Sequence, residues 1–207
     1  MWNQFPMTGG QEPSLDAGKV LLRRRQRACR SAVSPELRVQ AGLELAQLVQ
    51  GQWPDRALLA YASTGSEVDT WPLLRQTWAR GQRLWLPLVS DQQLRWYGID
   101  GEDQLRPGYH SILEPDPDIA EAGLPADPML ILVPGLAFTR DGGRLGQGGG
   151  FYDRALCGLR SEGRDILALG LAFACQVLPA LPRGSHDQDV DMLVAFGEDG
   201  AQLALAD

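Results

Sequence analysis

The residues that could do chemistry are concentrated in a glycine-dense loop between a short apolar run and a predicted helix. The apolar run ends at Val133, and the predicted helix begins near Phe151. The glycines of the loop are Gly142, Gly143, Gly146, Gly148, Gly149 and Gly150. Glycine lets backbone N–H groups approach a phosphate, and the N-terminus of the helix adds a partial positive charge. Arg144 can hold the same phosphate with a forked pair of hydrogen bonds. The stretch therefore predicts an anion-binding site.

The spacing of this loop excludes two common phosphate-binding motifs. A P-loop needs Gly-Lys-Ser or Gly-Lys-Thr, and the loop has no lysine; the dinucleotide fingerprint G-x-G-x-x-G is compressed here into residues 146–150. The alternative interpretation is a flexible glycine loop without a ligand. Asp153 follows the loop, and its carboxylate would repel bound phosphates unless a divalent cation lay between them.

A predicted helix from about Ser14 to Ala32 is the second candidate. Its basic residues recur at helical spacing on one face, and these are Lys19, Arg23, Arg27 and Arg30. Its apolar residues recur every seven positions and are expected to face the core; these are Leu15, Leu22 and Cys29. The basic face is either solvated or a cationic wall that docks a polyphosphate, and charge alone favours the solvated face.

Carboxylates follow two of the apolar segments that we interpret as strands. Glu67 and Asp69 come after a predicted strand over Ala57–Ala62, and ligands bind at the carboxyl ends of strands in open α/β sheets. Asp69 can instead cap a predicted helix over Thr70–Arg80, which is the role we favour. Three further acids, Asp187, Asp189 and Asp191, precede the last predicted strand, residues 192–196, and in isolation they indicate a solvated turn.

The glycine stretch resembles the signature of the 5-formyltetrahydrofolate cyclo-ligase family, also called methenyltetrahydrofolate synthetase. The family pattern is Pro-Gly-x-x-Phe, a short gap, and Gly-x-Arg-Leu-Gly-x-Gly-x-Gly-Tyr-Tyr-Asp. Residues 134–138 and 142–153 match it without a gap. The chain departs from the pattern at three positions. Phe151 replaces the first tyrosine, Gly149 stands where some members have lysine, and Thr139 stands where an aspartate is usual.

The resemblance runs from Lys19 to Asp191 and implies roles for single residues. A Lys-x-x-x-Arg pair that contacts ATP in the family matches the residues from Lys19 to Arg23. A Glu-Val/Ile-Asp/Glu-Thr segment places a folate contact on Glu67, whose carboxylate suits the donor row of a pterin. An Asp-x-x-Val-Asp segment places a magnesium ligand on Asp187, together with Asp153; Asp191 is the alternative if the register slips.

The site implied by the resemblance is therefore assigned as follows. For ATP binding we assign Lys19, Val20, Leu21, Leu22, Arg23, Arg144, Leu145, Gly146, Gln147, Gly148, Gly149, Gly150, Phe151 and Tyr152. For folate binding we assign Ala62, Glu67, Gln147, Gly148, Gly149, Gly150 and Phe151. Catalytic roles fall to Arg144, which would stabilise developing charge, and to Tyr152, whose hydroxyl would lie near the formyl group. The metal ligands are Asp153 and Asp187. Residues 109–115 resemble a further family segment, to which we assign no chemistry.

The resemblance implies an ATP-dependent ligase. It would close 5-formyltetrahydrofolate to 5,10-methenyltetrahydrofolate through a phosphorylated formyl group and release ADP and phosphate, with ATP as co-substrate and Mg²⁺ as cofactor. Two other readings remain open. One is an α/β enzyme acting on a sugar phosphate or a coenzyme A ester, which would need no ATP turnover. The other is a non-catalytic module that binds folate or a nucleotide.

The order of the predicted elements indicates the fold. Two helices followed by alternating strands and helices predict a single three-layer α/β domain, with a largely parallel sheet between helices and an N-terminal helical pair. Residues 1–12 are expected to form a loose N-terminus, and 13–207 the single cyclo-ligase-like domain. Residues 100–127 show little periodicity and are expected to form a long surface connection.

The composition narrows the class of protein and its partners. The 207 residues are 44% hydrophobic and 22% charged, which is ordinary for a globular protein. A net charge of −7 argues against binding nucleic acid or anionic membranes, and no apolar run is long enough to span a bilayer. Three widely spaced cysteines are typical of reduced residues in the cytoplasm. We therefore expect a cytoplasmic monomer whose partners are small molecules.

Overall fold

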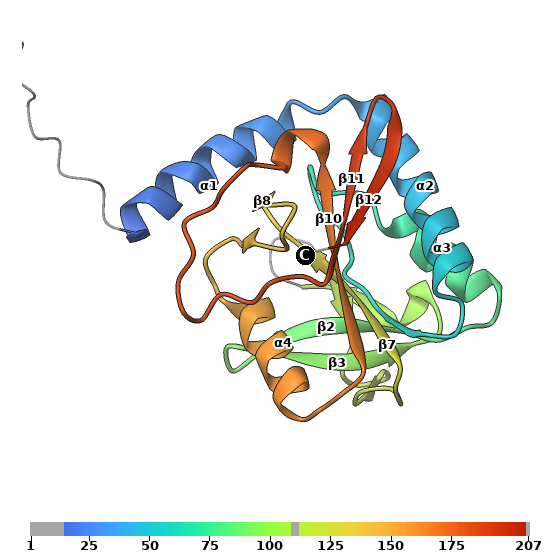
Figure 1. Ribbon diagram of the computed structural model, residues 1–207. Helices are drawn as coiled ribbons and strands as arrows, with labels where there is room; N and C mark the ends of the chain where they lie inside the picture. Colours follow the sequence, from blue (N-terminus) through green and yellow to red (C-terminus); the bar gives the residue numbers. More distant parts are fainter. Residues whose placement is uncertain (1–14, 109–111, 206–207) are drawn as a thin grey trace, which may run out of the picture.

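The computed structural model describes residues 15–108 and 112–205, so the expected loose N-terminus lies outside the described residues (Figure 1). The helices in this range are α1 (Leu15–Ser31), α2 (Pro35–Gln52), α3 (Trp71–Ala79) and α4 (Phe151–Ser161), with short 3₁₀ turns η1 (Glu102–Gln104) and η3 (Ala174–Gln176). The strands are β1 (Ala57–Leu59), β2 (Leu84–Ser90), β3 (Gln93–Ile99), β4 (Leu105–Pro107), β5 (Leu113–Pro115), β6 (Glu121–Ala122), β7 (Met129–Pro134), β8 (Ala137–Phe138), β9 (Arg144–Leu145), β10 (Ile166–Phe173), β11 (Met192–Gly197) and β12 (Gly200–Leu205).

One sheet organises the fold. Its strand order is β12-β11-β10-β7-β1-β2-β3-β6. The five strands from β11 to β2 in this order are mutually parallel, whereas β12, β3 and β6 pair antiparallel at the two edges. The expectation of a largely parallel sheet is confirmed, as is the N-terminal pair of helices. Among the described residues, no helix is long and apolar enough to cross a membrane.

The central strand β7 explains how the layers are held together. Its residues alternate between two cores, because successive side chains of a strand point to opposite faces. Leu130 and Leu132 pack in the core that includes residues of α2 and α3, whereas Ile131 and Val133 pack with residues of α4. A strand that is buried on both faces has a continuous apolar sequence, and β7 has one. The three expected layers are therefore α2 with α3, the sheet, and α4.

The helix starts follow local rules. Ser34 caps α2, where its Oγ accepts a hydrogen bond from the Leu37 N–H at 3.2 Å. The Oδ1 atom of Asp69 accepts a hydrogen bond from the Trp71 N–H at 3.0 Å. The N-cap role that we favoured for Asp69 was wrong by one position, because Thr70 is the N-cap; Asp69 instead holds the first helical N–H from one residue earlier.

Helix α1 differs from the prediction in the face that it buries. Lys19 and Arg30, on the basic face, are buried, with 9% and 8% of their surface exposed. Leu22 and Cys29 are only half-buried. The side chain of Leu15 lies outside the described residues. The prediction of an apolar inward face was wrong because α1 does not cover a face of the sheet. Figure 1 shows α1 running beside η3, along the end of the sheet where β10 terminates.

Other differences concern short elements. The strand expected over Ala57–Ala62 ends at Leu59, and the following residues line the cleft described below. The connection expected over 100–127 contains η1, β4, β5 and β6. Strand β12 and the β8–β9 hairpin were not predicted. The hairpin matters for function, because Phe138 pairs with Arg144 in it and so fixes the start of the glycine loop.

Candidate active site

A cleft of about 790 Å³ opens where β1 and β7 end. Tyr61 and Ala62, just beyond β1, line it together with Pro134 and Gly135 at the end of β7. The predicted site residues that line it are Lys19, Arg23, Ala62, Glu67, Arg144, Leu145, Gly146, Gln147, Gly148, Gly149, Gly150, Phe151, Tyr152, Asp153 and Asp187. The carboxyl ends of parallel strands are where open α/β sheets bind ligands, so the position of the cleft agrees with the fold.

The glycine loop reaches the cleft in a fixed conformation. Gly148 has φ of +114° and Gly150 has φ of +66°, backbone values that side chains disfavour. Gly150 is the residue from which α4 starts. A Cβ at Gly146 would meet Arg144 Nη1 at 2.9 Å, so this glycine leaves room for the guanidinium. The loop therefore places backbone and one arginine at a helix N-terminus, as an anion site requires.

Helix α1 closes one side of the cleft through polar contacts. The Lys19 ammonium contacts Asp187 Oδ2 at 2.5 Å, and Arg23 Nε donates to the Gly146 carbonyl at 3.0 Å. Val20 and Leu21, by contrast, are 64% and 70% exposed and do not line the cleft. Only the lysine and the arginine of the Lys-x-x-x-Arg segment therefore face the site; Leu22 is half-buried and does not line it either.

The two predicted metal ligands lie close together and are already paired with cations. Asp153 Oδ1 accepts from Arg144 Nη2 at 2.6 Å and from the backbone N–H of Gln188 at 3.1 Å. Burial alone would raise the pKa of Asp187, but hydrogen bonds from the Gly184 N–H and the Lys19 ammonium outweigh it and leave that pKa below its usual range. Asp191, the alternative, lies outside the cleft and binds Arg160 and the Ala168 N–H.

The donor set suits a hard cation that is shared with a ligand. No group of three or more His, Cys, Asp or Glu side chains is arranged to hold a metal within residues 15–108 and 112–205. However, Mg²⁺ is commonly held by one or two carboxylates together with phosphate oxygens. In the described part of the chain, Asp153 Oδ2 and Asp187 Oδ1 have no hydrogen-bond partner, so each aspartate keeps one oxygen for a cation.

The opposite side of the cleft contains the Glu67 carboxylate, which two groups of the protein hold. Glu67 Oε2 accepts from the Thr64 N–H at 3.1 Å, and Oε1 lies 3.5 Å from Arg30 Nη1. The same arginine donates from Nε to Ser66 Oγ at 3.1 Å. Arg30 therefore orients the carboxylate that we expect to contact a pterin. Burial, and secondly the negative charge of Glu67, raise the pKa of the nearby Tyr61.

Tyr152 lies between the two sides. Its hydroxyl is buried and has no hydrogen-bond partner among the described residues. Its ring lies 5.9 Å from the Arg144 guanidinium carbon. Burial, and secondly the negative charge of Glu67, raise the pKa of its phenol, so the hydroxyl stays protonated at neutral pH. A buried hydroxyl without a partner is costly, and a bound ligand that hydrogen-bonds it would remove this cost.

Part of the cleft wall was not predicted. The β2–β3 hairpin contributes Leu86, Pro87, Val89 and Leu94, and the chain before and within β5 contributes Ile112, Leu113 and Glu114. No pattern in the sequence distinguishes the hairpin residues as lining a cleft, since an apolar wall has the same pattern as a core. Residues 112–114 belong to a segment to which we assigned no chemistry, and the beginning of that segment, 109–111, lies outside the described residues. Arg30 also lines the cleft, although we assigned it no site role. It belongs to the predicted basic face, and its helical spacing with Lys19 and Arg23 was the sequence signal that could have identified it.

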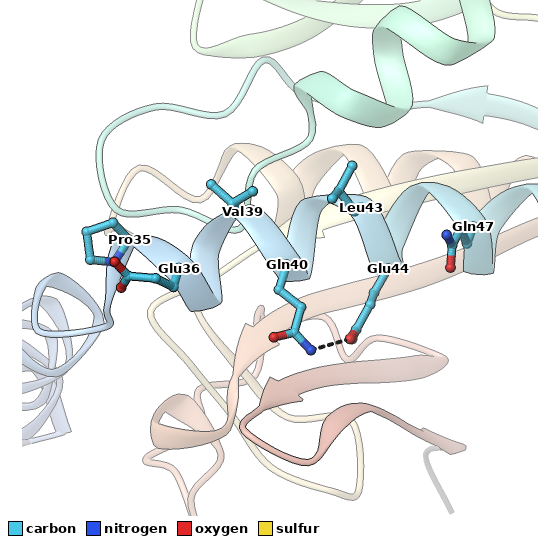
Figure 2. A pocket seen from close by; sticks show the side chains of 7 residues that line it. All are labelled: Pro35, Glu36, Val39, Gln40, Leu43, Glu44 and Gln47. Carbon is cyan, nitrogen blue, oxygen red and sulfur yellow. Dashed lines mark hydrogen bonds between the residues drawn. The ribbon is translucent and has the colours of Figure 1, made fainter.

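A second depression lies on the outer surface of α2 and has different properties. Figure 2 shows its side chains along a single helix, with Gln40 donating to Glu44 at 2.7 Å. Val39 and Leu43 are its exposed apolar members. It has no glycine loop, no cation and no strand end, so we assign the chemistry to the cleft at β1 and β7.

The sequence of the chain matches a known family. The profile of the "5-formyltetrahydrofolate cyclo-ligase family" covers residues 16–195. The chain belongs to this family. It is 31% identical over 160 residues to the 5-formyltetrahydrofolate cyclo-ligase of Escherichia coli K12, which covers 74% of this chain and 86% of that protein. It is also 35% identical over 143 residues to the 5-formyltetrahydrofolate cyclo-ligase of Mycolicibacterium smegmatis. That match covers 64% of this chain and 69% of that protein.

The fold agrees with this family assignment. The NMR structure of 5,10-methenyltetrahydrofolate synthetase from Aquifex aeolicus superposes with a TM-score of 0.75 at 29% sequence identity, covering 91% of this chain and 92% of that one. The relatives are named as ligases of the kind that the signature predicted. The resemblance and the α/β architecture are both confirmed.

The departures from the cyclo-ligase signature have a packing explanation. A Cβ at Gly149 would overlap the ring of Phe151, so this ring position excludes the lysine that some members have there. The Phe151 ring in turn lies 5.2 Å from the Arg154 guanidinium carbon. Thr139 is buried, and its Oγ1 accepts a hydrogen bond from Arg183 Nη2 at 2.8 Å. Gly149, Phe151 and Arg154 thus form one packed set.

Proposed function

We propose that this cyclo-ligase family member uses ATP to close 5-formyltetrahydrofolate to 5,10-methenyltetrahydrofolate. The observation that most supports this is a single cleft with two chemically distinct sides. Cations and a glycine loop line one side, and a carboxylate with apolar walls lines the other. The loop from Gly146 to Tyr152 lines this same cleft, so its backbone could align two reactants bound on the two sides.

The reaction explains why a phosphate site must lie beside the folate site. A formamide oxygen is a poor leaving group. Transfer of the γ-phosphoryl group of ATP to this oxygen releases ADP and makes it a good one. The neighbouring exocyclic nitrogen then attacks the activated carbon, the C–O bond breaks, and phosphate leaves. This route requires no protein nucleophile. Its demands are positioning and charge stabilisation, which the residues of the cleft are able to supply.

Lys19, Arg23 and Arg144 would bind the phosphates of ATP. In the structure they are paired with Asp187, the Gly146 carbonyl and Asp153. Phosphate oxygens would replace these partners, and the guanidinium of Arg144 would stabilise charge on the transferred group. The exchange keeps the cations neutralised before and after ATP binds, because buried charges without partners are strongly disfavoured.

Mg²⁺ would be held by Asp153 Oδ2 and Asp187 Oδ1, the oxygens to which no described residue donates a hydrogen bond. When bound, it would neutralise and orient the phosphates of ATP. The two aspartates are pre-positioned for this by backbone hydrogen bonds from Gln188 and Gly184, which do not depend on the cations. Release of Lys19 and Arg144 toward ATP would thus leave both carboxylates in place.

The folate would bind on the other side, against Glu67. A pterin presents a row of N–H donors, and the carboxylate held by Arg30 and the Thr64 N–H faces the cleft to accept from them. The protonated Tyr152 hydroxyl would donate a hydrogen bond near the formyl oxygen. The apolar wall from the β2–β3 hairpin would cover the rest of the ligand.

The test is spectrophotometric. Purified protein is mixed with 5-formyltetrahydrofolate, and the absorbance of the conjugated methenyl product is followed with and without ATP and Mg²⁺. We expect product only when both are present, with one ADP released for each methenyl group formed. Folded protein that binds both ligands without forming product would instead indicate a binding module. Protein that binds neither ligand would favour an enzyme of sugar phosphates or coenzyme A esters.

A further inference from the structure

Two of the three cysteines meet, although they are far apart in the sequence. Cys29 on α1 and Cys175 in η3 are separated by 146 positions, and the Cys29 Sγ donates to the Cys175 carbonyl at 3.3 Å. Burial, together with a hydrogen bond to the Cys29 thiol, raises the pKa of the Cys175 thiol to about 12. Cys29 is half-buried and Cys175 is exposed, so a small solute can reach the pair.

The pair lies where α1 meets the rest of the protein. Helix α1 carries Lys19, Arg23 and Arg30 into the cleft, and its contacts with the cleft are largely polar. Turn η3 directly follows β10, a central strand of the sheet. Figure 1 shows the two elements side by side. A covalent bond between these cysteines would therefore fasten the helix of the cleft wall to the sheet.

We propose that Cys29 and Cys175 form an oxidisable dithiol, a modification site at which peroxide creates a disulfide between α1 and η3. In the first step one thiolate attacks hydrogen peroxide, which gives a sulfenic acid and hydroxide. In the second step the other thiol attacks the sulfenic sulfur, the S–S bond forms, and water leaves. In total, two thiols and one peroxide become one disulfide and two waters.

The geometry favours the second step over further oxidation. In the reduced fold the Cys29 Sγ already lies 3.3 Å from the Cys175 carbonyl oxygen, so the two residues are neighbours before any oxidation. Cys157 provides the contrast. It is exposed on α4, and no contact in the described structure brings it to Cys29 or Cys175. Since a thiolate is the attacking species and the pKa of Cys175 is raised, the reaction should accelerate as the pH is raised.

The first measurement is the intact mass after peroxide treatment, followed by peptide mapping without reductant. We expect a loss of about 2 Da in the wild type and a cross-linked peptide pair containing Cys29 and Cys175. The matched control Cys157→Ser should behave like the wild type, whereas Cys29→Ser and Cys175→Ser should give no cross-link. Oxygen adducts on separate cysteines, or a cross-link that uses Cys157, would overturn the proposal.

The second measurement is the thermal unfolding of the reduced and oxidised protein. Closing a loop of this length restricts the unfolded chain, so the Tm should rise by about 5 °C or more. Dithiothreitol should reverse the rise, and Cys157→Ser should retain it. An unchanged or lower Tm of the cross-linked protein would show that the bond distorts the fold, which contradicts a pair that is already positioned.

Discussion

The two sides of the cleft are built on different principles. On the ion-paired side (Lys19, Arg144, Asp153 and Asp187), each charged group has an opposite charge within 2.6 Å. On the apolar side (Tyr61, Glu67, Leu86, Val89 and Leu94), Glu67 is held by Arg30 at 3.5 Å and most of the other lining residues are apolar. A ligand of the first side must exchange ion pairs, whereas a ligand of the second gains by burying apolar surface. Variants should therefore affect the two sides separately.

The largest effect is expected at Asp187. Asp187→Asn keeps the shape of the side chain but removes the charge that we assign to Mg²⁺, so activity should fall about 10- to 100-fold, with partial recovery at high Mg²⁺. The matched control is Asp191→Asn, because Asp191 binds Arg160 and the Ala168 N–H outside the cleft. Steady-state kinetics at several Mg²⁺ concentrations tests this. Full activity in Asp187→Asn with loss in Asp191→Asn would move the ligand to Asp191.

Asp187 should also make the stability of the protein depend on pH. The pKa of Asp187 in the folded protein lies below its usual value, so its ion pair contributes stability above the unfolded pKa of about 3.9 and loses it as the pH falls through the folded pKa. The difference in Tm between the wild type and Asp187→Asn should therefore be constant from about pH 5 to 8 and shrink below about pH 4. A difference that did not shrink as the pH fell below about 4 would exclude an ionised Asp187 as its source.

The next effect is expected at Tyr152, between the two sides. Tyr152→Phe removes a buried hydroxyl that has no hydrogen-bond partner among the described residues, so the free protein should be equally or more stable. The turnover number should nevertheless fall about tenfold if the hydroxyl contacts the formyl oxygen in the transition state. Because the pKa of this phenol is raised, the wild type should show no loss of activity up to about pH 9 from Tyr152 ionisation. An unchanged turnover number in the variant would remove Tyr152 from catalysis.

The smallest effect is expected at Arg154, which supports the apolar side from behind. Its Nε and Nη2 both donate to the Gln92 carbonyl at the tip of the β2–β3 hairpin, and its guanidinium covers Phe151. Arg154→Ala should loosen this wall and raise the KM for the folate about two- to fivefold, a cost of about 0.5–1 kcal/mol. The KM for ATP should not change. An equal rise in both would show that the arginine supports the glycine loop as a whole.

Local motifs allowed much of the site to be predicted. The glycine loop, Lys19, Arg23, Glu67 and Asp187 all line the cleft, because each belongs to a short pattern whose residues lie close together in sequence. The central apolar run also identified β7, since burial on both faces leaves a continuous signal.

The remainder depended on contacts that sequence spacing does not reveal. The inward face of α1 was predicted from its leucines, but the helix lies across the end of the sheet and buries polar groups instead. No pattern in the sequence distinguishes Val89 and Leu94 as lining residues, because an apolar cleft wall and an apolar core have the same pattern. Cys29 and Cys175 meet only through the folded chain. The expectations of a monomer and of a cytoplasmic location remain predictions.

The central claim is that one cleft binds ATP on its ion-paired side and the folate on its apolar side. The most direct test is isothermal titration calorimetry of Arg144→Lys and Glu67→Gln with each ligand separately, using a non-hydrolysable ATP analogue with Mg²⁺. We predict that Arg144→Lys, which loses the guanidinium fork, weakens binding of the ATP analogue about tenfold and leaves folate binding intact. Glu67→Gln should weaken folate binding and leave binding of the ATP analogue intact. Unchanged binding of the ATP analogue in Arg144→Lys, or equal loss of both ligands in either variant, would contradict the division of the cleft into two sides.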